Sequence, residues 1–254
     1  MPYETLLLEK KENILIVTLN RPQKKNAISP KMAQELASLF HSVGHHGSSA
    51  GAMVLQGGPG LFCSGLDLAE VAMLDDHGIE HFLEDIGGVF VAIQQAVFPI
   101  IAAIDGPAVA GGFDMAVMCD IRLASPQARF GQPEINVGFT QLIDPLWKII
   151  GLGRARELAM TGMIYGADEA YRIGLVNRLI PSEELFTKAF DLAVELAEKN
   201  PHAMAATKEN CRMVPGMETI QALNAQGWVF KNFVDTKDKR QRMIEYIMKL
   251  RSKK

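Results

Sequence analysis

An acidic side chain interrupts an apolar segment near the middle of the chain. Asp114 lies in the run Gly111-Gly-Phe-Asp-Met-Ala-Val-Met118, which predicts a helix with an otherwise apolar surface. A buried carboxylate without a partner is costly, so it normally finds hydrogen-bond donors or its pKa shifts. Asp114 could simply satisfy free N–H groups in the first helical turn. The adjacent glycines Gly111 and Gly112 favour a functional site, because a ligand can approach their N–H groups with no Cβ in the way.

A second acid follows in the segment Phe130-Gly-Gln-Pro-Glu-Ile-Asn-Val-Gly138. Pro133 suits the first position of a helix, and Glu134 comes directly after it beside apolar neighbours. Glu134 could be an ordinary acid at a helix start. It could equally be a proton-transfer group whose pKa is raised by burial.

A glycine-rich loop, Gly57-Gly-Pro-Gly-Leu-Phe-Cys-Ser-Gly-Leu-Asp-Leu68, comes after the apolar run 52–56. It lacks the Gly-Lys-Ser/Thr ending of a phosphate-binding loop, and it does not match the Gly-x-Gly-x-x-Gly pattern of dinucleotide-binding folds. Nucleotide binding of those two kinds is therefore disfavoured. The loop alone could be an ordinary turn between a strand and a helix.

The elements that must position these residues can be predicted from hydrophobic patterning. Alternation predicts a hairpin over 5–8 and 14–19, and short runs next to glycine or proline predict strands at 52–56, 100–104 and 175–180. The segment 121–124 is predicted as a further strand. Helical spacing predicts helices from Pro30 to Gly44, over 79–97, over 183–199 and from Pro201, with Pro215-Gly216 separating a third helix of the carboxyl-terminal region from a basic final helix. We therefore expect layered α/β architecture, with a sheet-containing core over residues 1–180 and a helical region over 181–254.

Composition excludes several classes of protein. The 254 residues are 48% hydrophobic and 22% charged with a net charge of −3, which argues against disorder and against general binding to nucleic acids. The three cysteines lack metal or redox spacing, and His41, His45 and His46 suggest a solvated turn rather than a metal site. No apolar run reaches the roughly 20 residues of a membrane span, and the first residues do not resemble a signal peptide, so we expect a cytoplasmic protein.

Taken in order, these segments resemble the crotonase, or enoyl-CoA hydratase/isomerase, superfamily. The resemblance covers essentially the whole chain. Its motifs are Leu19-Asn-Arg-Pro, Asn26-Ala-Ile-Ser29, Phe62-Cys-Ser-Gly-Leu-Asp67, Ile101-Ala-Ala-Ile-Asp-Gly-Pro-Ala-Val-Ala-Gly-Gly112, Cys119-Asp-Ile-Arg-Leu-Ala124, Phe130-Gly-Gln-Pro-Glu134, Leu158-Ala-Met-Thr-Gly162 and Gly174-Leu-Val-Asn177.

The resemblance implies a spiral of ββα units, a helical carboxyl-terminal trimerisation region, and a homotrimer or homohexamer. It implies an acyl-CoA substrate and no separate cofactor. By motif position, the backbone N–H groups of Leu66 and Gly111 would bind the thioester oxygen as an oxyanion hole. The residues that would contact coenzyme A are Leu66, Asp67, Leu68, Ala69, Gly111 and Lys249.

The two carboxylates of family hydratases fall on Asp114 and Glu134, which as a pair could hold and activate one water molecule. Asp114 replaces a glutamate found in many hydratases, and the family's dienoyl-CoA isomerases carry a further aspartate where Leu142 stands here. The segment 139–147 replaces a glycine-rich stretch and could reshape the acyl pocket. The methionines Met73, Met115 and Met163 could line that pocket or belong to the core.

Hydration of a 2-enoyl-CoA to a 3-hydroxyacyl-CoA is the predicted reaction. The alternatives are a double-bond isomerase in which Glu134 alone moves a proton, and a thioester hydrolase or decarboxylase. A different class, an RNA-binding or scaffolding homologue, would depend on the basic final helix. Salt-dependent retention on RNA, lost when Lys237, Lys239, Arg240 and Arg242 are neutralised, would identify that class.

Overall fold

The computed structural model describes residues 3–43, 50–233 and 236–251, and the side chains of 233–239 and 249 lie outside this description. The chain divides into two compact units, Met1–Glu198 and Lys199–Lys254. The first unit extends past residue 180, where the sequence analysis placed a boundary. It does so because helix α8 (Ser182–Ala197) packs on the sheet of the first unit.

The larger sheet of the described residues is mostly parallel. Its strands run in the order β1 (Leu6–Lys11), β2 (Ile14–Leu19), β3 (Ala52–Gln56), β4 (Ile100–Ile104), β6 (Ile121–Ala124) and β9 (Arg178–Leu179). β1 and β2 form an antiparallel hairpin, and the other neighbours are parallel. The predicted hairpin and the strands at 52–56, 100–104 and 121–124 are confirmed.

The strand predicted over 175–180 is wrong for its first half. Leu175 and Val176 donate their N–H groups to the carbonyl of Ala170, which closes the end of helix α7 (Ala167–Arg172). Only Arg178–Leu179 pairs with β6. The apolar character of Leu175 and Val176 reflects their burial in the core, not membership of a strand.

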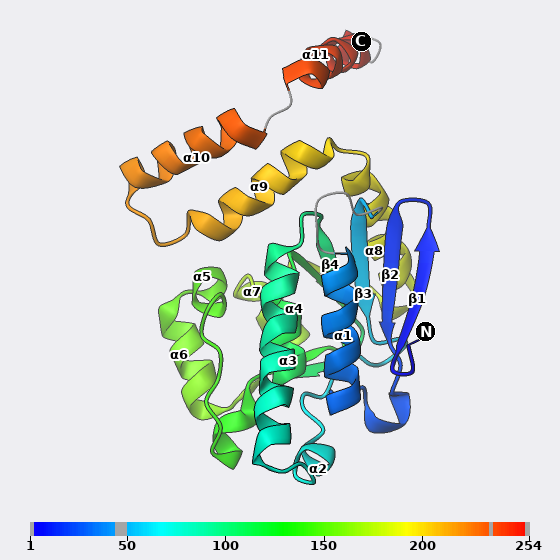
Figure 1. Ribbon diagram of the computed structural model, residues 1–254, viewed down its shortest axis with the longest axis vertical. Helices are drawn as coiled ribbons and strands as arrows, with labels where there is room; N and C mark the ends of the chain where they lie inside the picture. Colours follow the sequence, from blue (N-terminus) through cyan, green and yellow to red (C-terminus); the bar gives the residue numbers. More distant parts are fainter. Residues whose placement is uncertain (1–2, 44–49, 234–235, 252–254) are drawn as a thin grey trace. The chain divides into compact units, whose positions relative to one another are not determined.

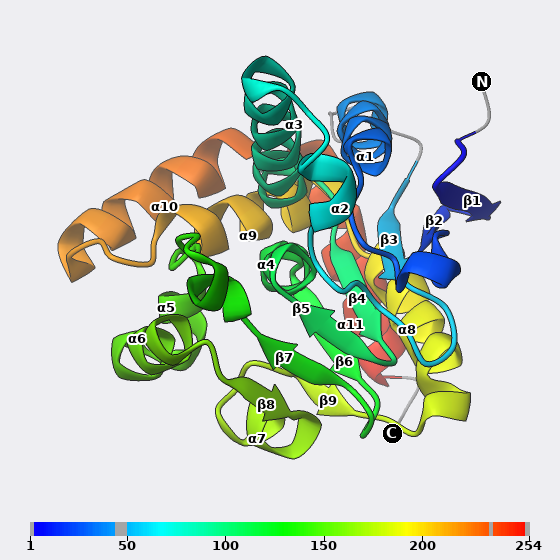
Figure 2. The same ribbon diagram turned by 90° about the horizontal axis from the view of Figure 1, so that it is seen from below.

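Helices cover both faces of the larger sheet (Figures 1 and 2). Alternate strand residues such as Val54 and Ile101 pack against α8. Their neighbours, such as Met53 and Leu55, face the cluster that contains α1 (Pro30–Val43) and α3 (Asp76–Gln95). Burial on both sides of the sheet explains why residues 52–55 and 100–104 are all apolar.

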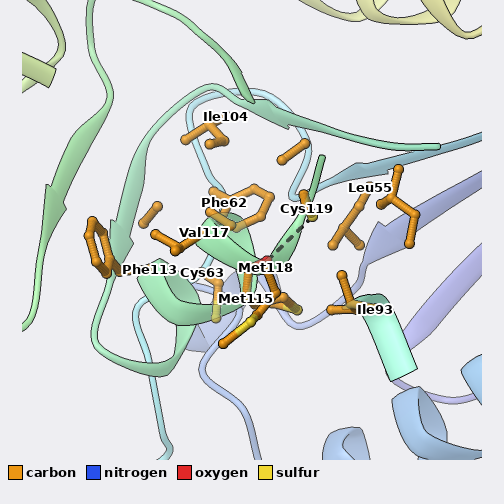
Figure 3. Packing of buried hydrophobic residues seen from close by; sticks show 14 of the residues in the cluster. Leu55, Phe62, Cys63, Ile93, Ile104, Phe113, Met115, Val117, Met118 and Cys119 are labelled. Carbon is orange, nitrogen blue, oxygen red and sulfur yellow. Dashed lines mark hydrogen bonds between the residues drawn. The ribbon is translucent and has the colours of Figure 1, made fainter. Parts of the chain in front are cut away.

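Helix α4 (Gly111–Met118) is buried along its whole length. Figure 3 shows its side chains Phe113, Met115, Val117 and Met118 among residues from other elements, including Phe62 and Ile93. Dense packing of this kind holds a backbone with little freedom. The first turn of α4, which carries Asp114, therefore has little conformational freedom.

A smaller sheet, which the sequence analysis did not predict, brings the two acidic segments together. It contains β5 (Pro107–Val109), β7 (Arg129–Gly131) and β8 (Ile164–Gly166). β5 and β7 are parallel, and Val109 is paired with Gly131. The carboxyl ends of both strands therefore reach the same edge, where β5 continues into α4 and β7 into the 3-10 helix η2 (Pro133–Val137).

The remaining elements of the first unit are η1 (Pro22–Lys24), α2 (Leu68–Val71), α5 (Leu146–Ile150) and α6 (Leu152–Thr161). The second unit contains α9 (Pro201–Met213), α10 (Thr219–Phe233) and α11 (Thr236–Arg251), and α9 packs against α10. None of the helices in the described ranges combines the length and the apolar character that crossing a bilayer requires.

Candidate active site

The glycine-rich loop is held in place by a buried asparagine. Asn26 is fully buried, and its Nδ2 donates to the carbonyl oxygens of Gly57 and Phe62, each at 2.9 Å. Its Oδ1 accepts a hydrogen bond of 2.8 Å from the N–H of Arg21. Because a buried amide with all these bonds has little freedom, Asn26 fixes the loop relative to the end of β2.

The end of this loop meets the start of α4. Cys63 and the strand β5 exchange backbone hydrogen bonds, from Cys63 N–H to Pro107 at 3.0 Å and from Val109 N–H to Cys63 at 3.1 Å. Gly65 has a φ of +93°, and a Cβ there would lie 2.6 Å from the Cβ of Ala110 and 3.5 Å from the nitrogen of Gly111. The backbones next to Leu66 and Gly111 are thus in close contact, as the sequence analysis requires.

The amides of Leu66 and Gly111 differ from their neighbours in hydrogen bonding. Asp67 N–H donates to Ile28 at 2.9 Å, and Ala110 N–H donates to Gly131 at 2.9 Å. Within the described ranges, by contrast, no acceptor is found for the N–H of Leu66 or of Gly111. Gly111 is the first residue of α4, where N–H groups have no partner inside the helix. Neither amide is therefore committed to an acceptor in the described part of the chain.

Ala110, between β5 and α4, has the uncommon backbone angles φ 52° and ψ −135°. A non-glycine residue in such a region carries a strain of about 1–3 kcal/mol. The hydrogen bond to Gly131 holds this turn. Strain of this kind is typical of functional sites, and here it directs the chain into the first turn of α4.

Asp114 is buried, with 7% of its surface exposed, and its Oδ1 accepts a hydrogen bond of 2.7 Å from Gln132 Nε2. Burial raises the pKa of Asp114 to about 7, against the lowering effect of the Gln132 hydrogen bond. The negative charge of Glu134 raises this pKa further, so the two carboxyl groups are close enough to interact. Raised carboxyl pKa values are characteristic of groups that transfer protons near neutral pH.

Glu134 lies in the first turn of η2 and is partly buried. Burial raises its pKa above the usual value of a glutamate. Its Oε2 is buried and has no hydrogen-bond partner among the described residues. The structure thus brings together the two acids that the sequence analysis selected.

The side chain of Asp67 stabilises the end of the glycine-rich loop. Its carboxylate is buried, accepts a hydrogen bond from Glu70 N–H at 3.3 Å, and pairs with the guanidinium of Arg21 at 3.0 Å. Burial acts to raise its pKa, but the Glu70 and Arg21 hydrogen bonds outweigh burial and lower it. Arg21 also bonds to Glu70 and to the carbonyl of Ala27, so it ties α2 to the end of β2.

The other predicted coenzyme A contacts are placed as follows. Leu68 is half exposed and Ala69 is exposed, both at the start of α2. Lys249 belongs to α11 in the second unit, and its side chain lies outside the described part. Of the candidate histidines, His45 and His46 fall in the range 44–49 and lie outside the described residues as well.

The candidate pocket methionines have different environments. Met115 belongs to the core, whereas Met73 is 85% exposed and Met163 is 38% exposed. In the segment 139–147, Phe139 and Leu142 expose about half of their surfaces. Among the described residues there is no group of three or more histidine, cysteine, aspartate or glutamate side chains arranged to hold a metal ion.

Sequence reasoning missed Gln132. It stands within the motif Phe130-Gly-Gln-Pro-Glu134, and in the structure it is fully buried and bonded to Asp114. Its position between a short strand and Pro133, two residues before an acid of interest, was the available signal. An uncharged amide gives no hint of its partner until the fold is known.

Comparison with known proteins identifies the class to which this fold and this site belong. The profile of the family described as enoyl-CoA hydratase/isomerase matches residues 9–253. The crystal structure of an enoyl-CoA hydratase from Bacillus anthracis superposes with a TM-score of 0.91 at 27% identity, covering 97% of each chain. An enoyl-CoA hydratase from Streptomyces coelicolor A3(2), described as putative, superposes with a TM-score of 0.90 at 28% identity, covering 98% of this chain and 93% of that one.

Two relatives illustrate the similarity in sequence. A probable enoyl-CoA hydratase of Rhizobium meliloti is 32% identical over 252 residues, which are 98% of this chain and 97% of the relative. A short-chain-enoyl-CoA hydratase of Clostridium acetobutylicum is 32% identical over 255 residues, with the same coverage. The chain belongs to the enoyl-CoA hydratase/isomerase family and has the crotonase fold, as the sequence analysis predicted.

Proposed function

We propose that this protein hydrates a 2-enoyl-CoA to a 3-hydroxyacyl-CoA. The observation that carries the proposal is the pairing of Asp114 with Glu134, two acids with raised pKa values, near the close contact between Gly65 and the start of α4. The names of the relatives support the same reaction. Coenzyme A enters as part of the substrate, and the reaction requires no further cofactor.

In the proposed mechanism the N–H groups of Leu66 and Gly111 bind the thioester oxygen. They stabilise the negative charge that develops there, and such donors contribute about 10²–10³ each in rate. Glu134 takes a proton from water as the oxygen adds to C3, and the C2–C3 π electrons move toward the thioester to give an enolate. Glu134 then returns the proton to C2, and Asp114, whose pKa is raised by burial and by the charge of Glu134, is the second acid of the site.

Isomerisation of an enoyl-CoA double bond is the second candidate. It needs only the two amides and one proton-transfer group. The hydrogen bond from Gln132 to Asp114 favours it, because this bond occupies one oxygen of Asp114, whereas Oε2 of Glu134 is buried and has no partner among the described residues. In that case Glu134 would move a proton between C2 and C4 of the acyl chain.

These reactions can be separated by incubating the purified protein with a panel of enoyl-CoA esters and identifying the products by mass spectrometry. Hydration adds the mass of one water, isomerisation leaves the mass unchanged, and hydrolysis releases coenzyme A. We expect the first result with 2-enoyl esters. An unchanged panel, or release of coenzyme A alone, would contradict the proposed function.

We also propose that the backbone from Leu66 to Ala69 contacts coenzyme A. A homotrimer or homohexamer is proposed on the exposed apolar side chains of the second unit. These include Ile220, Leu223, Trp228, Phe230, Met243 and Met248. Light scattering on the purified protein would give the assembly. A reducing compartment such as the cytoplasm is proposed because the buried Cys63 forms no disulfide.

A further inference from the structure

The amide of Gln132 is fixed in one orientation. Gln132 is fully buried between β7 and η2, and its Nε2 donates to Asp114 Oδ1 at 2.7 Å and to the carbonyl of Leu142 at 2.8 Å. Both hydrogens of this nitrogen are therefore used. Turning the amide over would place Oε1 against two acceptors, so the two bonds decide which way the oxygen points.

The other end of the same amide has no partner. Gln132 Oε1 is buried and accepts no hydrogen bond within the described part of the chain. Leaving a buried acceptor unsatisfied costs about 1–3 kcal/mol, so such an atom in a rigid site calls for a donor from a ligand. Glu134, two residues further on, has a second buried acceptor without a partner, Oε2.

Two acceptors match the two hydrogens of one water molecule. The side chain of Asp114 is one methylene shorter than a glutamate, and one of its oxygens is engaged by Gln132. Gln132 has a longer side chain, is fixed by Asp114, and presents an oxygen. The amide oxygen of Gln132 can therefore accept a hydrogen bond from the water, as the carboxylate of a second glutamate would.

We propose that Gln132 is a catalytic residue whose Oε1, together with the carboxylate of Glu134, accepts the two hydrogens of the water that adds to C3. Asp114 then acts on the water through Gln132. As the oxygen–C3 bond forms, one proton passes to Glu134 and later to C2. The other hydrogen stays on the oxygen as the product hydroxyl and donates to Gln132 Oε1 throughout. This inference rests on the proposed function.

The variant Gln132→Met tests the proposal because it keeps the length of the side chain and removes both the amide hydrogens and the oxygen. Two reactions of the same protein are compared. The first is hydration of a 2-enoyl-CoA. The second is exchange of the C2 protons of a saturated acyl-CoA with D₂O, followed by NMR, which needs Glu134 and the two backbone amides but no added water.

We expect Gln132→Met to lower kcat for hydration about 100-fold, the usual effect of losing the positioning of a reactant, and to change C2 proton exchange by less than about threefold. Gln132→Asn, which keeps an amide on a shorter side chain, should show the same split if the methionine variant does not fold. Gln94→Met is the matched control. It removes an amide that donates to the carbonyl of Met118 at the other end of α4, and it should hydrate at the parental rate.

Hydration by Gln132→Met within about threefold of the parent would overturn the inference. A loss of hydration and exchange in equal proportion would also overturn it, because that is the result of a purely structural role. In both cases the proposed function would stand, since the parent hydrates the ester. A parent that hydrates no 2-enoyl-CoA would overturn the proposed function and this inference together.

Discussion

Replacing Asp114 by asparagine should stabilise the protein at neutral and alkaline pH. Burial raises the pKa of Asp114 from 3.8 to about 7. Between these pH values the folded protein binds more protons at this site than the unfolded chain does, so the free energy of unfolding falls as pH rises. Asparagine has a similar shape, carries no charge, and can still accept the hydrogen bond of Gln132 through its Oδ1.

The magnitude follows from the pKa. A shift of about three units corresponds to about 4 kcal/mol at about 1.4 kcal/mol per unit, and relaxation around the charge reduces this to about 2–4 kcal/mol. The gain in the free energy of unfolding of Asp114→Asn over the parent should be absent below pH 4, grow between pH 4 and 7, and be complete at pH 8. For a chain of this size it corresponds to roughly 5–15 °C in the melting temperature.

Melting temperatures of the parent and of Asp114→Asn between pH 4 and 8 provide the assay. Asp191→Asn, which removes an exposed carboxylate from α8, is the control, and it should melt close to the parent. An Asp114→Asn protein that is no more stable than the parent at pH 8 would refute the reasoning. So would a difference that is the same at pH 4 and pH 8.

Three further substitutions test other parts of the site. Glu134→Gln should reduce hydration and isomerisation by about 10²–10⁴ in steady-state assays with acyl-CoA binding retained; turnover at the parental rate would exclude Glu134 as the base. Gly65→Ala should lower the free energy of unfolding by about 2–5 kcal/mol and remove most of the activity, because the φ of +93° and the Cβ of Ala110 at 2.6 Å both oppose a side chain. Gly60→Ala is the control, because Gly60 has a positive φ but open space around it, and this variant should retain activity. An equal loss of activity in both variants would refute the argument that Gly65 must contact the start of α4. Arg21→Met leaves the buried Asp67 without its ion pair, so it should lower the free energy of unfolding by about 3–5 kcal/mol in a urea titration; a loss below about 1 kcal/mol would contradict this.

Much of the first unit can be predicted from the sequence because its central strands are buried on both faces. The run 52–56 is apolar except for Gln56 and lies between Gly51 and Gly57, and the run 100–104 is apolar throughout and follows Pro99. They form β3 and β4 as predicted. The run 175–180 is apolar only at its two ends, around Asn177 and Arg178, and its first residues close helix α7. Apolar character thus predicts that a residue is buried more reliably than it predicts that the residue belongs to a strand. The short strands β5, β7 and β8 have too few residues to show a pattern.

The acids of the site could be selected from sequence, whereas their environment could not. Asp114 was conspicuous because a charge in an apolar helix needs an explanation. Gln132 was not, because its two hydrogen bonds depend on β7 ending beside α4 and on the approach of Leu142. The function of Asp67 likewise depends on Arg21, which is far away in sequence and contacts it only in the folded chain.

The central claim is that the N–H groups of Leu66 and Gly111 bind one thioester oxygen with Glu134 beside the reacting carbons. A crystal structure of the protein with a 3-hydroxyacyl-CoA tests this directly. The thioester oxygen should lie about 2.7–3.1 Å from both nitrogens, with the 3-hydroxyl group in hydrogen-bond contact with Glu134. A thioester oxygen bound elsewhere, or a hydroxyl group remote from Glu134, would contradict the account.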